Sequence, residues 1–395
     1  MFSELLAAVL VCANAVATSS STSGARPNII FILSDDLGYG DYSISDQVSA
    51  NSTRIPTPNV ARLAKNGMKF SRGYSGQVCA PSRTMLMTGR HLGHATIRGN
   101  DGAYTPLLST DHTVASVLKK AGYTTGLVGK WGLGNFGTTG YPNAQGFDHF
   151  VGQDTQVGCH DWYPLAVCND TVHNAPLNTK DELVFIECLG PNAKCTWAND
   201  LDRTEGVAFI RNAHAQAKPF FLYLSSTTPH AGSLAGTGPK PPLYSAYNPV
   251  PYPYNTKFEN ESSAAGWTDQ EKLFASAVWA EDVMVGAVLD ELEALSIEKN
   301  TVVFFSGDNG PDIPGVLFDD AGFFRGKKRS LHEGGIRQTI VVQWVGTIAA
   351  NSVSDDFFIF YDLLPTAADL AGVAPAVWEP LTDGLRCVYY FQSIL

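Results

Sequence analysis

The chain has 395 residues, 44% of them hydrophobic and 16% charged, which is typical of a globular enzyme with one large domain or two smaller ones. Its formal net charge of -11 argues against nucleic acid or an anionic membrane as the main partner, because both select basic surfaces. Beyond the N-terminus no apolar run is long enough to cross a bilayer, so we expect a soluble mature protein without a membrane span.

The N-terminus has the pattern of a secretory signal peptide. An apolar run from Leu5 to Ala17 is followed by a Ser/Thr-rich stretch, and small residues near its end offer cleavage sites. Glu4 and the lack of a basic residue before the run weaken the pattern, and the alternative is a frayed hydrophobic terminus. We predict a signal peptide at residues 1–17 and a protein of the secretory pathway, secreted or lysosomal.

Cysteine usage favours the same compartment. Four cysteines fall in a loop-rich segment, and their spacings fit no metal-site pattern. We therefore predict two disulfides of open connectivity in an oxidising environment. The four are Cys159, Cys168, Cys188 and Cys195. Sequons beginning at Asn51, Asn169 and Asn260 are compatible with glycosylation.

Short apolar runs alternate with helical patterns along the chain. The runs predict buried parallel strands at residues 28–33, 125–129, 219–225, 301–306 and 338–344. The helical patterns lie at residues 59–65, 114–121, 203–217, 269–295 and 357–371. This alternation predicts an α/β layered fold, with a central, mostly parallel sheet flanked by helices.

Polar side chains follow four of the predicted strands at the point where each ends. Ligands of such folds gather beyond the carboxyl ends of the strands, so we expect these side chains to meet in one site. They are Asp35 and Asp36, Lys130, His230, and Asp308 with Asn309.

Residues 79–90, CAPSRTMLMTGR, are the most informative segment of the chain. Pro81 suits the first turn of a helix, so Cys79 would lie near a helix N-terminus, where backbone N–H groups favour an anion. This position predicts a cysteine with a low pKa. The alternative is a buried structural cysteine beside a helix.

The pattern C-x-P-S-R followed by T-G-R resembles the signature of the sulfatase family. The resemblance implies that Cys79 is oxidised to formylglycine by the formylglycine-generating enzyme during export. It also implies an alkaline-phosphatase-like layered fold, with a small antiparallel subdomain at the C-terminus.

Two oxygen-rich turns, SDDLG at residues 34–38 and SGDNG at residues 306–310, suit a hard cation. Three carboxylates and one carboxamide favour Ca²⁺ or Mg²⁺ over Zn²⁺. Each turn alone could equally be an Asp-rich turn or a helix cap. The resemblance implies that five residues hold the cation, namely Asp35, Asp36, Cys79, Asp308 and Asn309.

The resemblance further implies four residues that contact the sulfate. They are Arg83, Lys130, His230 and Lys328. His230 or Lys328 would protonate the leaving oxygen. Lys328 is chosen by counting back from Glu333, and its neighbours Lys327 and Arg329 are predicted to be a solvated charge run.

One position departs from the family pattern. Many relatives carry a histidine two residues after the lysine equivalent to Lys130, where it acts as a base, whereas this chain has Gly132. His160 could supply the missing base, although we expect a surface histidine there.

The resemblance runs from Pro27 to Gly372, and we predict a catalytic domain at residues 27–380 followed by an atypical tail at residues 385–395. The family's C-terminal subdomain is expected to be largely missing, which would expose apolar surface and leave the chain poorly stable. The predicted activity is hydrolysis of sulfate monoesters of carbohydrates or aryl alcohols. The alternatives are a phosphomonoester or phosphonate hydrolase on the same scaffold, and an inactive, truncated glycan-binding relic.

Overall fold

The computed structural model describes most of the chain. The described residues are 26–44, 55–100, 105–156, 158–164, 166–170, 172–176 (backbone only), 196–231, 250–259, 266–312, 320–388 and 391. The predicted signal peptide, Cys188, Cys195, Asn51 and Asn260 lie outside these residues. Asn169, the remaining predicted glycosylation position, is exposed.

Within the described residues, ten strands form one sheet in the order β10-β2-β9-β8-β1-β7-β3-β4-β5-β6. Pairing along the central run β8-β1-β7-β3-β4 is parallel throughout. Strands β5 and β9 run against the others. The strands are β1 (Asn28–Ser34), β2 (Met68–Tyr74), β3 (Thr124–Lys130), β4 (His149–Gln153), β5 (Ala166–Asn169), β6 (Val172–Pro176), β7 (Phe220–Ser225), β8 (Thr301–Gly307), β9 (Arg337–Gln343) and β10 (Ser352–Ile359).

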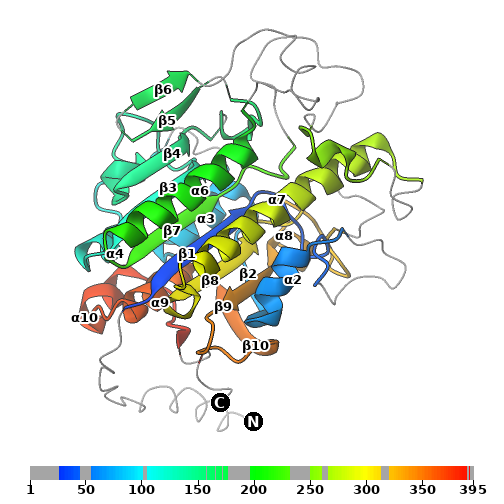
Figure 1. The fold of residues 1–395 in the computed structure, drawn as a ribbon. Coiled ribbons are helices and arrows are strands. Elements are labelled where there is room, and N and C mark those ends of the chain that lie inside the picture. The colour runs from blue at the N-terminus through cyan, green and yellow to red at the C-terminus, as the bar shows by residue number, and fades with distance from the viewer. Residues whose placement is uncertain are drawn as a thin grey trace.

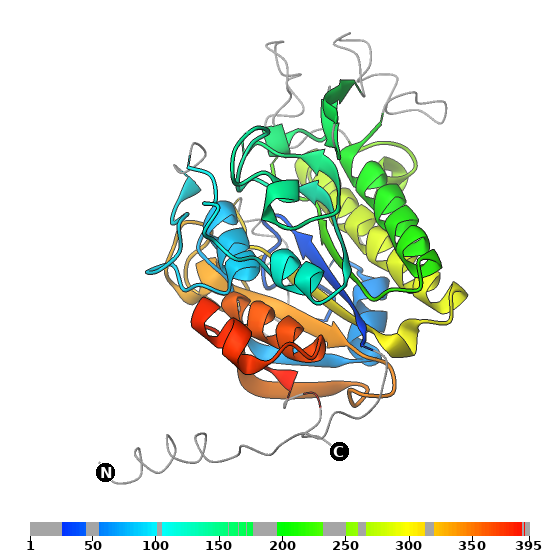
Figure 2. The same cartoon turned by 90° about the vertical axis from the view of Figure 1, so that its left-hand side faces the viewer.

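Helices cover both faces of the sheet, as the α/β prediction requires. Figure 1 shows α6 and α7 lying across one face, and Figure 2 shows α4 and α9 on the other side. Two apolar clusters, one per face, fill the space between the layers. The helices are α2 (Pro58–Lys65), α3 (Cys79–Thr88), α4 (Val114–Lys120), α6 (Ala198–Ala215), α7 (Asp269–Ala294), α8 (Glu333–Ile336), α9 (Leu363–Leu370) and α10 (Pro375–Trp378). Among the described helices, none is both long and apolar enough to cross a membrane.

The predicted central strands are confirmed, with one error of direction. Strands β1, β7 and β8 are buried along their whole length, which explains their continuous apolar runs. The run at residues 338–344 does form a strand, β9, but it is antiparallel to both of its neighbours. Just beyond the end of β8, Gly310 N–H donates to the Gly335 carbonyl at 2.9 Å, so the residues that follow β8 lie beside those that precede β9. Strand β9 therefore begins where β8 ends and must run back.

Two helices begin at residues other than those predicted from the sequence. The pattern at residues 357–371 was interpreted as one helix, but Phe357 to Ile359 end strand β10, and α9 begins only at Leu363. Helix α6 begins at Ala198, five residues before the predicted start at Arg203. Its first turns carry the buried polar residues Asn199 and Asp202, so the apolar periodicity is absent there.

The described part of the predicted tail packs against the core. Cys387 and Phe391 are each 1% exposed, and the Phe391 ring lies 6.3 Å from that of Phe304. Val353 and Phe357 on the edge strand β10 are about half exposed, and the exposure of apolar surface through a missing subdomain stays a prediction. Poor stability of the chain stays a prediction.

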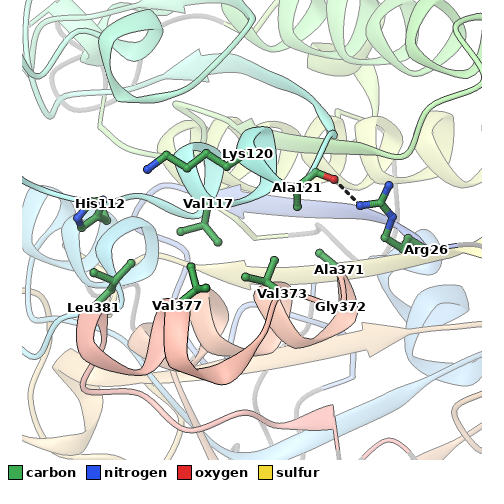
Figure 3. Close-up of a pocket in the computed structure, with 10 residues that line it drawn as sticks. All are labelled: Arg26, His112, Val117, Lys120, Ala121, Ala371, Gly372, Val373, Val377 and Leu381. Atoms are coloured by element: carbon green, nitrogen blue, oxygen red, sulfur yellow. Dashed lines mark hydrogen bonds between the residues drawn. The ribbon is translucent and has the colours of Figure 1, made fainter. Parts of the chain in front are cut away.

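A pocket of about 350 Å³ lies between the end of α4 and the helices α9 and α10. Figure 3 shows its apolar walls, Val117 above and Val373 and Val377 below. Arg26 and Ala121 line it just before strands β1 and β3 begin, so it lies at the amino edge of the sheet. The predicted site residues come directly after the carboxyl ends of the strands and therefore lie at the opposite edge of the sheet.

Candidate active site

Cys79 lies at the start of helix α3, as Pro81 predicted. Its side chain is fully buried, and the thiol lies 3.2 Å from Asp35 Oδ1 and 3.9 Å from Asp36 Oδ1. The predicted low pKa is wrong for this thiol. Burial, and then the negative charge of Asp35, raise the pKa of Cys79 well above its ordinary value. The sequence pattern around Pro81 shows neither this burial nor the three carboxylates that surround the sulfur.

The two oxygen-rich turns meet around Cys79. Ligand atoms of Asp35, Asp36, Cys79 and Asp308 all lie within 4.8 Å of one another, and all four residues are buried. Asp36 has a left-handed backbone conformation, with φ of 62°, and its N–H donates to Asp308 Oδ1 at 3.1 Å. This conformation turns the chain immediately after Asp35, so that two consecutive carboxylates reach one site.

Asn309 completes the oxygen cluster. Its Nδ2 donates to Asp36 Oδ1 at 2.7 Å, so its Oδ1 is directed elsewhere. That buried oxygen has no hydrogen-bond partner within the part of the chain that the structure describes. A buried acceptor without a partner is costly, and a cation bound between these oxygens would satisfy it. The donor set, three carboxylates and one amide oxygen, fits Ca²⁺ or Mg²⁺.

Three buried cations balance the three carboxylates one to one. Arg83 donates from Nε and Nη2 to Asp308 Oδ2 at 3.1 and 3.0 Å, and its Nη1 also donates to the Ser225 hydroxyl. Lys130 Nζ lies 2.6 Å from Asp35 Oδ2. Lys328 Nζ lies 2.7 Å from Asp36 Oδ2.

The pKa shifts follow from this arrangement. Burial acts to raise the pKa of Asp35, but Lys130, His230 and Arg83 together outweigh it and hold that pKa well below its ordinary value. Burial opposes the charge of Lys130, yet Asp35 reverses the effect and raises its pKa. The pKa of Lys328 is raised in the same way by its anionic neighbours, against the effect of burial. The lysines therefore stay charged inside the protein.

Two histidine rings lie face to face beside the carboxylates. The rings of His160 and His230 are 3.9 Å apart and nearly parallel. His230 Nδ1 lies 2.8 Å from the Ala231 carbonyl, so Nδ1 carries the proton and Nε2 faces Asp36 Oδ2 at 3.3 Å. Burial is the largest of the effects that lower the pKa of both histidines.

The expectation of a surface histidine at position 160 is wrong. Its Nε2 lies 3.0 Å from Lys130 Nζ, and a ring nitrogen lies within 4.8 Å of the Cys79 sulfur. Because an ammonium can only donate, the neutral ring accepts this hydrogen bond. Burial, then Lys130 and His230, lower the pKa of His160 and keep it neutral.

Gly132 has a backbone conformation that favours glycine. Its φ is 73°, and a Cβ added there would lie 2.3 Å from Gln156 Oε1. A histidine at this position would meet both backbone strain and the Gln156 side chain. The backbone at position 132 and the neighbouring Gln156 side chain are therefore arranged for a residue without a Cβ.

The neighbours of the predicted residues lie away from the cluster. Lys327 and Arg329 are exposed, and Arg329 pairs with Asp312, so the structure brings only Lys328 of these three to the carboxylates. Cys159 is a free, buried thiol 2.9 Å from the Gln153 carbonyl, which contradicts the predicted disulfide at this position. The Cys159 thiol donates its hydrogen bond to a carbonyl only six residues earlier in the chain.

Sequence reasoning missed two residues behind the cluster. Ser225, the last residue of β7, accepts a hydrogen bond from Arg83. Glu281 on α7 is buried and contacts the turns that carry Asp35 and His230. The sequence does contain a signal for Glu281, because it lies four residues from Ala277 and from Val285 on the buried stripe of α7.

The chain is similar to known proteins over most of its length. The sulfatase family profile matches residues 27–373. The chain belongs to the sulfatase family. The chain is 34% identical to N-acetylgalactosamine-6-sulfatase of Mus musculus over 378 residues, which cover 91% of this chain and 65% of that protein. It is 28% identical to arylsulfatase G of Homo sapiens over 389 residues, covering 89% and 66% of the two chains.

A solved structure shares the fold. The crystal structure of Ps i-CgsB in complex with k-i-k-neocarrahexaose matches with a TM-score of 0.72 and 24% identity, over 93% of this chain and 77% of that one. The family resemblance and the α/β fold predicted from the sequence are thus confirmed. The chain spans 65% of the length of the mouse relative.

Proposed function

We propose that this sulfatase hydrolyses sulfate monoesters of carbohydrates or aryl alcohols, using a formylglycine made from Cys79 and a divalent cation. The observation that supports the proposal best is the buried cluster itself. It joins a cysteine at a helix start to three carboxylates and three cations, which come from the ends of β1, β3 and β8, from helix α3 and from the segment before α8. A sugar sulfate is the preferred substrate class, since relatives include an N-acetylgalactosamine-6-sulfatase.

Five residues are proposed to hold the cation, namely Asp35, Asp36, Cys79, Asp308 and Asn309. Ca²⁺ is preferred and Mg²⁺ is the alternative, because all the donors apart from position 79 are carboxylate or amide oxygens. When present, the cation and the aldehyde hydrate at position 79 would supply a polarised sulfate oxygen and a nucleophilic hydroxyl. Export and the formylglycine-generating enzyme would be required to make the aldehyde.

The protein's own cations are proposed to bind the ester and stabilise its transition state. Arg83, Lys130 and Lys328 are already charged and held by hydrogen bonds, so they need little reorganisation when negative charge grows on the sulfate oxygens. His230 has Nδ1 committed to the Ala231 carbonyl, which leaves Nε2 for the leaving oxygen. Protonated His230 or the Lys328 ammonium would donate the proton to that oxygen.

His160 is proposed as the base that the glycine at position 132 cannot provide. The neutral ring lies close to the Cys79 sulfur, and its Nε2 would take a proton at this point of the site once the hydrogen bond from Lys130 is released. We expect His160→Ala to lower kcat by about 10²-fold, as is usual when a general base is lost. His160→Gln, which cannot take a proton at neutral pH, should be equally slow. Steady-state kinetics on an aryl sulfate tests this, and wild-type kcat in both variants would contradict it.

The deciding experiment is mass spectrometry of the tryptic peptide that contains Cys79, after secretion of the full chain from a eukaryotic host. It is paired with sulfate and phosphate release from matched aryl and sugar esters. Formylglycine in the peptide together with sulfate release is the expected result. Modified peptide with phosphate release alone would favour the phosphomonoester alternative. An unmodified thiol in all molecules would contradict the proposal and favour a glycan-binding relic.

A further inference from the structure

Glu281 is a buried carboxylate outside the cluster described above. It lies in the middle of α7, is 1% exposed, and belongs to a helix face that is otherwise largely apolar. A carboxylate in such surroundings destabilises the fold unless its oxygens are hydrogen-bonded. Its partners therefore show what the position is used for.

Both carboxylate oxygens of Glu281 accept hydrogen bonds from three different elements. Oε1 accepts from the Ser34 hydroxyl at 2.8 Å. Oε2 accepts from the Thr228 hydroxyl at 2.7 Å and from Asn199 Nδ2 at 3.0 Å. The partners come from the end of β1, the turn after β7 and the start of α6.

Two of these partners adjoin the candidate active site. Ser34 directly precedes Asp35, and Thr228 is two residues before His230. The two turns are also joined to each other, because Asp35 N–H donates to the Thr228 carbonyl at 3.1 Å. Moving Glu281 would therefore release both turns from α7.

We infer that Glu281 is a positioning residue, which ties the Asp35 turn and the His230 turn to α7 and so sets the distance between a cation ligand and a leaving-group acid. The inference rests on the proposed function for the roles of Asp35 and His230. Outer contacts of this kind orient the groups that bind a metal, and their loss costs affinity without removing a ligand.

The charge of Glu281 gives a second readout. Burial raises its pKa to about 7, against the hydrogen bonds that it accepts, and the negative charge of Asp35 acts in the same direction as burial. The other ionisable groups facing it are Asp202 of α6 and Tyr42. Since the folded-state pKa is raised, Glu281 contributes stability at low pH that is lost as pH rises through about 7.

Asp282 offers a matched control. It is the next residue of α7 and equally buried, yet it accepts hydrogen bonds from the Asn59 and Val60 N–H groups at the start of α2. Within the described residues, the hydrogen-bond partners of Asp282 all belong to α2. Asp282→Asn should therefore perturb the fold without moving either turn.

The test compares wild type, Glu281→Leu, Glu281→Gln and Asp282→Asn as secreted full chains. Hydrogen exchange should become faster in peptides covering residues 28–38 and 220–231 only in the leucine variant, and faster near residues 57–62 only in Asp282→Asn. Calorimetric titration should show that Glu281→Leu binds Ca²⁺ at least about tenfold more weakly than wild type does. Glu281→Gln should keep most of both properties. In chelator, wild type should lose thermal stability relative to Glu281→Gln as pH rises through about 7.

Unchanged hydrogen exchange at both turns in Glu281→Leu would overturn the inference. Faster exchange at the same two turns in Asp282→Asn would also overturn it. Failure of the proposed function is separable from this result. If no chain releases sulfate, or if wild type binds no Ca²⁺, the proposed activity or cation site fails. The exchange measurement still decides the role of Glu281.

Discussion

Replacing Cys79 by alanine is expected to remove sulfate-ester hydrolysis almost entirely. If position 79 carries the nucleophile, its loss should lower kcat by at least about 10⁴-fold, because binding groups alone recover little of the rate. The fold should survive the change. The thiol is buried among carboxylates that raise its pKa, so replacing it by a methyl group removes no charge at neutral pH. The measurement is sulfate release by the purified variant, with thermal unfolding to verify its fold.

Cys387→Ala is the matched control for this experiment. Cys387 is also buried, but it lies in the C-terminal tail, where its N–H donates to Thr366 Oγ1 at 2.9 Å. Its replacement should leave turnover within a few tenths of a logarithmic unit and leave the Cys79 peptide modified. Substantial sulfate release by Cys79→Ala would contradict the proposed nucleophile, whatever the control does.

Replacing Arg83 by methionine should have the second large effect, on both stability and turnover. The guanidinium is fully buried and makes two hydrogen bonds to Asp308, so its removal leaves a buried carboxylate without its charge partner. Breaking a buried ion pair from one side costs about 3–5 kcal/mol. Turnover should fall by about 10²–10³-fold, because a preorganised cation is lost from the sulfate site. Urea denaturation in chelator and kinetics in Ca²⁺ measure the two effects.

Two further variants separate charge from geometry. Arg83→Lys keeps the charge but cannot make two parallel bonds to Asp308, so it should recover only part of the stability. Arg62→Met removes partly exposed ion pairs with Asp290 and Glu293, far along the chain from the site, and should cost below about 1 kcal/mol. Equal stability losses in Arg83→Met and Arg62→Met would show that burial of the Arg83 pair has no special effect.

The predicted strand ends explain why most of the site could be found from the sequence. Asp35 and Asp308 follow apolar runs that are buried on both faces of the sheet, and parallel strands bring their carboxyl ends to one edge. The pairing of Leu33 with Ser306 shows the register that does this. Strand β2 was missed because it is only half buried and its apolar residues alternate.

The direction of strand β9 and the first residues of the helices could not be predicted from the sequence pattern. The apolar run of β9 is the same whether the strand is parallel or antiparallel, since both of its faces are covered. The first residues of α9 were misassigned because Phe357 and Phe358 belong to an edge strand whose apolar residues continue into the helix. In both cases the sequence pattern reports burial, and burial does not specify direction or boundary.

The sequence alone determined the family, the α/β layers and the set of polar side chains at the carboxyl edge of the sheet, because apolar runs, strand-end residues and the segment around Cys79 are all local patterns. Only the tertiary structure showed that the pKa of Cys79 is raised, that His160 lies beside Lys130, and which side chains Glu281 contacts. A pKa depends on burial and on charges that come from distant parts of the chain, and here burial of the thiol, followed by the charge of Asp35, 44 residues away, raises the pKa of Cys79. His160 and Glu281 acquire their contacts across 30 and 247 residues of sequence, so a local pattern can indicate that Glu281 is buried but cannot show what either side chain contacts.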